Sequence, residues 1–381
     1  MPPQPAYDLA PVLQLMLLGI AVAIGPLLWV WLRNRQASPA QQLRALTLLT
    51  LFLTFDLVLF GAFTRLTDSG LGCPDWPGCY GKPSPLGATQ QIASAQANMP
   101  SGPVTLTKAW IEMLHRYLAT GVGVLILTLT ALAWWNRRVE KALAPVSPWW
   151  PTLALAWVGL QGAFGAWTVT MRLFPLIVTL HLLGGMILLV LLADLALRYD
   201  GWQRPVPRPG VSRRLRMAVL LCGVLLLAQI GLGGWVSANY AVLACSDFPT
   251  CQGFWWPTMD LSQGFELWRE LGLTTSGGNI DFAALTAIHF VHRLMAVPVV
   301  LALLGLAAAL VPNLALRRRA LALAALVLLQ VATGVGNVVL EWPLLGAVLH
   351  TGGAAAMLLL LAWIWGASAA SVAQHRVGIS P

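Results

Sequence analysis

Acidic and imidazole side chains stand near the ends of strongly apolar segments, at spacings that suit metal ligation and proton transfer. Glu112 precedes His115 by one helical turn, and His289 precedes His292 in a similar stretch much later in the chain. Ionisable residues are costly inside a membrane and mark functional sites when they occur there. The two related stretches indicate a duplicated protein with one site in each copy.

Two further histidines complete the pattern. His181 and His350 each follow a proline, Pro175 or Pro343, near the start of a later apolar segment. Since a helix rises 1.5 Å per residue, we expect all four histidines at one depth near the outer face. Two imidazoles from different helices of an apolar bundle suit the two axial positions of a heme iron.

The predicted ligand pairs are His115 with His181, and His292 with His350. Glycines beside the later histidines would let a flat macrocycle approach the backbone. The alternative for any single histidine is a hydrogen bond between helices. Four histidines at one depth, two in each repeat, favour the heme interpretation.

The copies differ at one position, where Glu112 is matched by His289. A carboxylate beside a bound macrocycle can take a proton or stabilise a developing cation. This difference predicts chemistry at the first site and electron transfer at the second. The alternative is that Glu112 caps its helix near the positive end of the dipole.

Three other charged residues have open roles. Arg116 and Arg293 directly follow His115 and His292, and we predict that they pair with heme propionates. The alternative is an arginine that extends to the membrane surface. Asp56 lies deep in an apolar segment, where it would serve a proton path or bond to a neighbouring helix.

Composition places the chain in the membrane. Of its 381 residues, 58% are hydrophobic and only 10% are charged, whereas soluble domains carry about 25% charged residues. Segments of about 20 apolar residues are long enough to cross a bilayer. The fold class is therefore an all-α polytopic membrane protein, with nine spans predicted at 11–32, 45–64, 112–135, 150–170, 176–197, 216–236, 284–311, 319–340 and 344–367.

The landmarks recur in the same order, which predicts two tandem four-helix bundles related by a pseudo-twofold repeat. We expect an extra N-terminal transmembrane helix in 1–40, an N-terminal half in 41–200 and a C-terminal half in 201–381. Each half has an even number of spans, so the repeats should share one orientation.

The net charge of +9 reflects membrane sidedness and does not require a nucleic-acid partner. Most Lys and Arg residues fall in alternate loops, which places those loops in the cytoplasm and the N-terminus outside. The opposite loops hold two cysteine pairs, Cys73 with Cys79 and Cys245 with Cys251. Close pairs on an oxidising side favour disulfides over a metal site or free thiols.

Several motifs together resemble the heme A synthase family of cytochrome oxidase assembly factors. They are Gly-Ala-Phe-Thr-Arg-Leu-Thr-Asp-Ser-Gly-Leu-Gly-Cys-Pro-Asp-Trp-Pro-Gly-Cys at 61–79, Glu-Met-Leu-His-Arg at 112–116, His-Phe-Val-His-Arg at 289–293, and the two Pro-to-His segments. The resemblance covers about residues 45–367. The predicted helix in 11–32 departs from the family's usual eight-helix pattern.

The resemblance implies an oxidoreductase that converts the C8 methyl of heme O to the formyl of heme A by successive hydroxylations. It implies that His292 and His350 hold a resident heme b, and that His115 and His181 bracket the substrate heme. Glu112 would be the essential carboxylate. The Cys73–Cys79 pair would be the family's outer-loop disulfide, and Cys245–Cys251 a second pair found in part of the family.

The expected location is the bacterial inner membrane, with the cysteine loops on the periplasmic side. The expected partners are heme O, a heme O synthase and a membrane electron donor, and a homo-oligomer is compatible with the pattern. The rival hypothesis is a diheme b electron carrier that oxidises no methyl group. The mismatch between Glu112 and His289 favours the enzyme, because a carrier has no need for that asymmetry.

Overall fold

The computed structural model describes residues 10–139, 146–203 and 211–368. Within these ranges the protein is helical, and nine helices are long and apolar enough to cross a membrane. All nine predicted spans are confirmed. They are α1 (Ala10–Asn34), α2 (Pro39–Leu66), α4 (Leu106–Val139), α5 (Trp149–Thr170), α6 (Pro175–Gln203), α7 (Arg213–Ala238), α9 (Phe282–Leu310), α10 (Arg317–Val339) and α11 (Leu344–Ser368).

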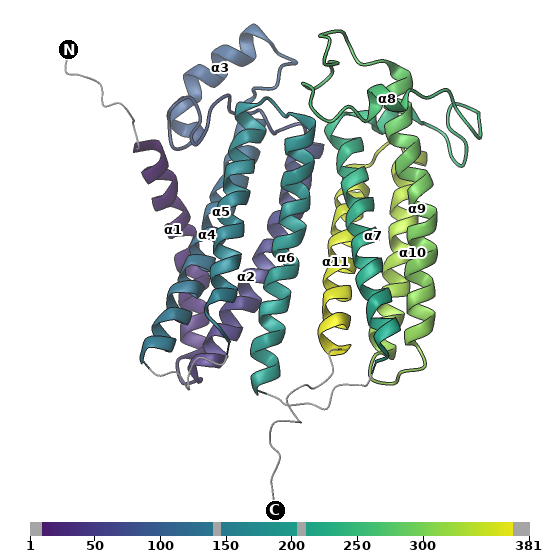
Figure 1. Ribbon diagram of the computed structural model, residues 1–381. Helices are drawn as coiled ribbons and strands as arrows, with labels where there is room; N and C mark the ends of the chain where they lie inside the picture. Colours follow the sequence, from purple (N-terminus) through teal and green to yellow (C-terminus); the bar gives the residue numbers. More distant parts are fainter. Residues whose placement is uncertain (1–9, 140–145, 204–210, 369–381) are drawn as a thin grey trace, which may run out of the picture.

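Eight of these helices form two neighbouring sets (Figure 1). We call α2, α4, α5 and α6 the N-terminal set, and α7, α9, α10 and α11 the C-terminal set. In each set the first helix packs on the second, the second on the third and the third on the fourth. The sets meet where α6 packs on α7, and where α11 packs on α6 and α2.

The repeat relates two contacts between the sets. In one contact glycine lies on the fourth helix of its set and leucine on the first, and in the other the two residue types are exchanged between these helices. A Cβ added at Gly352 of α11 would lie 2.6 Å from Leu59 Cδ2 of α2, so a larger residue there would have to displace the end of that leucine. On the other side of the interface, a Cβ at Gly231 of α7 would lie 3.5 Å from Leu183 Cδ1 of α6. Leucine over glycine therefore lets helices of different sets approach closely at both places.

Four helices also end in the same way at the end of the bundle that carries both disulfide loops, which we call the outer end. In α2, α5, α7 and α10 the helix is followed by a non-glycine residue with positive φ whose N–H donates to a carbonyl three residues back. This left-handed residue turns the chain toward the next segment. The four residues are Asp68 (φ 52), Arg172 (φ 50), Tyr240 (φ 54) and Glu341 (φ 53).

The extra helix α1 packs on α4 and α2. A Cβ added at Gly19 would lie 2.3 Å from Thr120 Cγ2 of α4, so the two helices touch where only glycine fits. Many large apolar side chains of α1 are exposed, among them Leu17 (65%) and Leu28 (52%), as expected for a face that meets lipid.

The outer loops contain short helices. Segment 84–107 is rich in Gln, Ala, Ser and Gly, a composition that predicts a loose segment. It forms instead the 3-10 turn η1 (Pro85–Ala88) and the helix α3 (Thr89–Asn98), which packs against the start of α4. The apolar and charged residues of 260–271 predict an amphipathic helix on the membrane surface. The helix there is only α8 (Leu261–Gly264), four residues long, with η3 (Ala241–Ala244) preceding it in the same loop. The sequence pattern was thus wrong about both loops.

Candidate functional site

Each of the four predicted heme ligands lies against a glycine of the preceding helix in its set. A Cβ added at any of these glycines would come within 3.0–3.3 Å of the histidine Cε1. Such an approach is tighter than most real Cβ contacts, so a larger residue would displace the ring. The pairs are Gly61 with His115, Gly165 with His181, Gly233 with His292, and Gly334 with His350.

Glu112 is buried at the outer end of α4, with 3% of the residue exposed. Its Oε2 accepts a hydrogen bond from the backbone N–H of Cys73 at 2.7 Å, and its Oε1 accepts one from Arg116 Nη2. Both partners would stabilise the charged carboxylate. Glu112 is therefore held between its own helix and the first disulfide loop.

Arg116 fixes that loop to α4. Its Nη1 donates to the carbonyl oxygens of Gly78 (2.6 Å), Asp75 (3.0 Å) and Pro77 (3.2 Å). Within this chain the guanidinium bonds to loop carbonyls and to Glu112, and its predicted pairing with a heme propionate stays a prediction. This loop-anchoring role was missed by the sequence analysis.

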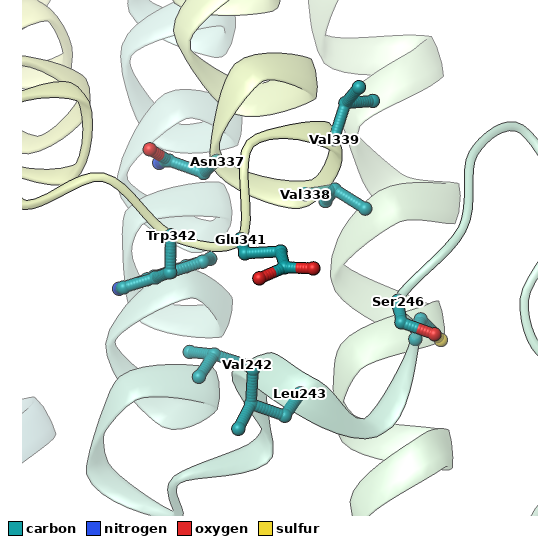
Figure 2. Close-up of a pocket in the computed structure, with 9 residues that line it drawn as sticks. Val242, Leu243, Ser246, Asn337, Val338, Val339, Glu341 and Trp342 are labelled. Carbon is teal, nitrogen blue, oxygen red and sulfur yellow. The ribbon is translucent and has the colours of Figure 1, made fainter.

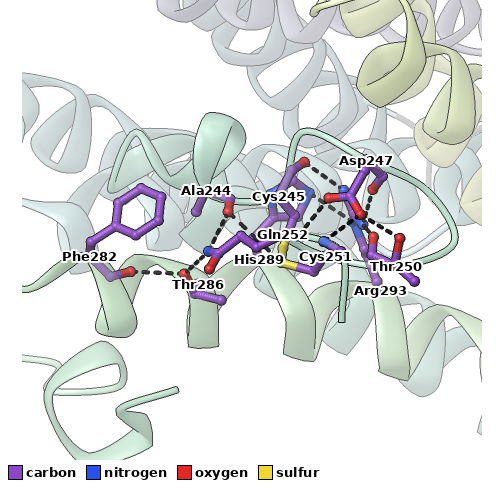
Figure 3. The surroundings of a disulfide bond; sticks show 11 residues. Ala244, Cys245, Asp247, Thr250, Cys251, Gln252, Phe282, Thr286, His289 and Arg293 are labelled. Carbon is purple, nitrogen blue, oxygen red and sulfur yellow. Dashed lines mark hydrogen bonds between the residues drawn. A yellow bond between two sulfur atoms is a disulfide. The ribbon is translucent and has the colours of Figure 1, made fainter. Parts of the chain in front are cut away.

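The second disulfide loop, drawn in Figure 3, is anchored by Arg293 in the way that Arg116 anchors the first. Arg293 Nη1 donates to the carbonyl oxygens of Asp247 (2.8 Å) and Thr250 (3.0 Å), and Nη2 donates to that of Cys245 (2.7 Å). For Arg293 too, the propionate role stays a prediction. The two disulfides, Cys73–Cys79 and Cys245–Cys251, are confirmed.

One aspartate organises each loop. Asp75 accepts hydrogen bonds from the N–H groups of Tyr80 and Gly81, both at 2.6 Å. Asp247 accepts from the N–H groups of Gln252 (2.6 Å) and Gly253 (3.0 Å), and from the hydroxyl of Thr250. The Thr250 bond, followed by that of Gly253, holds the pKa of Asp247 below its usual range. The repeated Cys-x-Asp-x-Pro-x-Cys pattern was the signal that could have identified these residues.

The two histidine pairs differ in what holds their Nδ1 atoms. His292 Nδ1 lies 3.1 Å from Gln229 Nε2, and His350 Nδ1 lies 3.0 Å from Thr333 Oγ1. Among the described residues, Nδ1 of His115 and of His181 has no hydrogen-bond partner. Metal-bound histidines usually bond through the second ring nitrogen, which fixes the ring. The C-terminal pair is therefore the more rigidly oriented.

This donor set fits heme. In both sets the ligand candidates lie on diagonally placed helices, α4 with α6 and α9 with α11, and glycine lies against each ring. The four imidazoles are partly buried and form no ion pair among the described residues, so they are suited to iron rather than to a salt bridge. At His350 the Thr333 hydroxyl can accept from Nδ1–H, which leaves Nε2 as the ligating atom.

The outer ends of the two sets are joined through α2 and α7. Arg65 Nη2 donates to the carbonyl of Ser237 at 2.5 Å, and its guanidinium lies 4.0 Å from the centre of the Tyr240 ring. The hydroxyl of Tyr240 in turn bonds to Asp68. Arg65 and Ser237 are 172 residues apart, as are Asp68 and Tyr240, so corresponding positions of the two repeats meet here.

A small cavity of about 110 Å³ opens at the outer end of the C-terminal set (Figure 2). It is lined by η3 and by the turn after α10, including Leu243, Ser246, Glu341 and Trp342. Ligand sites for drug-sized molecules are about 300–1,000 Å³, so this cavity is too small for a heme. It lies outside the predicted ligand pair and adds no residue to it.

Asp56 is exposed on α2, on the same face as Leu48 and Phe52. It forms no ion pair with any residue that the structure describes. Of the two roles predicted for it, a bond to a neighbouring helix of this chain is not observed within those residues, and the proton path stays a prediction.

Comparison with known proteins identifies the family. The COX15-CtaA model, described as cytochrome oxidase assembly protein, matches residues 44–362. The chain belongs to this family. The match begins inside α2, so α1 lies outside it.

Named relatives agree with the predicted heme A synthase family. The heme A synthase of Shewanella oneidensis is 40% identical over 323 residues, which cover 85% of this chain and 96% of that relative. The heme A synthase of Allorhizobium ampelinum is 30% identical over 351 residues, covering 85% and 90%. That of Methylobacterium sp. (strain 4-46) is 30% identical over 382 residues, covering 94% and 98%.

Proposed function

We propose that this protein is a heme A synthase, which oxidises the C8 methyl of heme O to the formyl of heme A by successive hydroxylations for cytochrome oxidase assembly. The observation that carries the proposal is Glu112, a buried carboxylate held one turn from His115 in one set only. The names of the relatives, which cover most of both chains, support the same activity.

The substrate site is assigned to the N-terminal set, residues 41–200. His115 and His181 bracket heme O, and their unpartnered Nδ1 atoms suit a ligand that must be exchanged after each reaction. Glu112 takes up a proton or stabilises positive charge that develops at the methyl carbon. Arg116 and the Cys73 N–H keep the carboxylate in place for this role.

The resident heme b is assigned to the C-terminal set, residues 201–381, between His292 and His350. Bound there, heme b supplies a one-electron redox centre. Gln229 and Thr333 orient the two imidazoles through Nδ1, and Gly233 and Gly334 leave room for the rings. These contacts suit a cofactor that stays bound.

The membrane assignment follows from the nine apolar helices and from the basic loops. We place the protein in the bacterial inner membrane with both disulfide loops in the periplasm, where disulfides persist. A heme O synthase and a membrane electron donor are the proposed partners, and a homo-oligomer is compatible with the exposed apolar face of α1. Residues 1–40 are assigned to an accessory helix.

The test is chromatography of hemes extracted from cells that make heme O, with and without this protein. We expect heme A, or its hydroxylated precursor, only when the protein is present. Unchanged heme O, with the protein purified and carrying two b-type hemes, would overturn the proposal in favour of a diheme electron carrier. Expression level and electron supply are checked in the same cells.

A further inference from the structure

Arg116 and Arg293 occupy matching positions but differ in their charged partner. Arg116 forms a buried ion pair with Glu112, with 7% and 4% of the two side chains exposed. Arg293 instead donates from Nε to Nε2 of His289 at 3.3 Å. A ring nitrogen that accepts a hydrogen bond carries no proton, so this imidazole is neutral. The cation of Arg293 therefore lacks the carboxylate that neutralises Arg116.

The remaining surroundings of the two guanidinium groups are matched. Each donates to carbonyl oxygens of a disulfide loop, and each loop contains one aspartate, Asp75 or Asp247, bonded to loop N–H groups. Arg172 and Glu341, at corresponding helix ends, also differ in charge, but both are exposed and screened by water and salt. The difference between the direct partners of the two guanidinium groups is one carboxylate. The loop of the C-terminal set also holds the buried Arg269, which bonds to Asn239 and not to this cluster.

We infer that neutral His289 leaves Arg293 without the buried carboxylate partner that Arg116 has, and thereby raises the reduction potential of the heme between His292 and His350. Reduction of ferric to ferrous iron adds one electron and removes one positive charge. A cation held nearby in a medium of low dielectric constant therefore favours the reduced form. Arg293 directly follows the ligand His292 on α9, so the two side chains start one residue apart on the same helix.

The same reasoning explains why the carboxylate occurs in one set only. A glutamate at position 289 would neutralise Arg293 as Glu112 neutralises Arg116. It would then lower the potential of a heme that must accept and pass on electrons. His289 is thus a residue that tunes the redox centre, and it needs no contact with the heme itself. This inference rests on the proposed heme assignment.

The experiment is a potentiometric titration of heme b in the full-length protein, in a His115→Ala background so that only the C-terminal heme is followed. We expect His289→Glu to lower the ferrous-to-ferric ratio at a fixed potential at least tenfold, which equals 59 mV for a one-electron couple. His289→Gln, which stays neutral and can still accept from Arg293, should leave the ratio within threefold of the parent.

Arg293→Gln provides a second route, because it removes the cation rather than neutralising it. Arg293→Gln should also lower the ferrous-to-ferric ratio at a fixed potential. It keeps the inference testable should His289→Glu fail to fold. Unchanged potentials in every variant that retains a bis-histidine spectrum would overturn the inference. An equal shift in His289→Gln and His289→Glu would also overturn it, since charge would not be the cause.

Failure of the heme assignment has a separate signature. If His292→Ala retained the b-type spectrum in the His115→Ala background, the site assignment itself would be wrong, whatever the potentials. Absence of heme A formation in the wild-type protein would overturn the proposed enzyme activity while leaving the measured potentials, and hence this inference, intact.

Discussion

The carboxylate of Glu112 accepts a hydrogen bond from the backbone N–H of Cys73 at 2.7 Å, across 39 residues of sequence. Through this bond and the Arg116 ion pair, the only buried glutamate in the described part of the chain is fixed to the first disulfide loop. In the second loop, Arg293 and His289 take the places of Arg116 and Glu112. Four predictions follow from this arrangement and from the glycine contacts.

Replacement of the carboxylate should separate heme binding from chemistry. In Glu112→Gln the Cys73 contact is kept by the amide oxygen, but the charge is lost, so we expect heme A formation to fall at least 100-fold, within the range typical of removing an acid or base. Heme b content should be unchanged. The measurement is heme chromatography of purified protein and whole cells.

The matched control for this change is Glu341→Gln, at an exposed carboxylate of the C-terminal set. It should retain full heme A output. Normal heme A formation by Glu112→Gln would refute the assigned role of the carboxylate.

The ligand assignment predicts an asymmetric response to loss of each histidine. His292→Ala and His350→Ala should each remove the resident b-type spectrum, because the iron loses an axial ligand that Gln229 or Thr333 orients. His115→Ala, the matched change in the N-terminal set, should retain that spectrum and stop heme A formation. Loss of heme b in His115→Ala alone would reverse the assignment of the two sites.

The glycine contacts predict a strong dependence on side-chain size. A Cβ at Gly233 would lie 3.0 Å from His292 Cε1, so Gly233→Val must displace the ligand ring. Overpacking of this kind costs about 1–3 kcal/mol, equivalent to roughly 5- to 150-fold weaker heme binding. Heme retention during purification and titration with added heme measure the effect.

Gly223 on the same helix is the control, because nothing lies within 4 Å of the corresponding Cβ position. Gly223→Val should therefore bind heme b like the wild type. Equal losses of heme b in Gly233→Val and Gly223→Val would show that valine disturbs α7 in general. The contact with His292 would then not be what limits the side-chain size at position 233.

The Glu112–Arg116 pair should show strong coupling in stability. Removal of one partner of a buried ion pair costs about 3–5 kcal/mol, because the other charge is left without compensation. We expect Arg116→Gln to lower the Tm strongly, and the double variant with Glu112→Gln to lower it by less than the sum of the two single changes. Thermal denaturation in detergent gives these values, and strictly additive Tm shifts would argue against a coupled pair.

Much of the architecture could be predicted because it depends on local composition. A run of about 20 apolar residues must cross the membrane wherever it occurs, so each of the nine spans could be identified without its neighbours. The four histidines, Glu112 and the cysteine pairs were identified for a similar reason. Polar residues in an apolar segment, and cysteines in an outer loop, are conspicuous in the sequence itself.

The loop helices were not predictable in this way. Segment 84–107 is rich in small and polar residues, yet Ile92 is 1% exposed because α3 rests on the start of α4. Conversely, the apolar residues near Asp260 suggested a long surface helix, and only α8 formed. In both loops the conformation is selected by tertiary contacts, chiefly with the helix that follows the loop, and these contacts override local preference.

The sequence by itself determined the membrane fold, the candidate ligands and the carboxylate that distinguishes the two repeats. The tertiary structure decided what those residues touch. It directed Arg116 and Arg293 to the loop carbonyls, Cys73 to Glu112, and Gln229 and Thr333 to the ligand histidines. Such contacts depend on the packing of helices and on loop closure, because each bond joins groups that lie on different elements and meet only when the chain is folded.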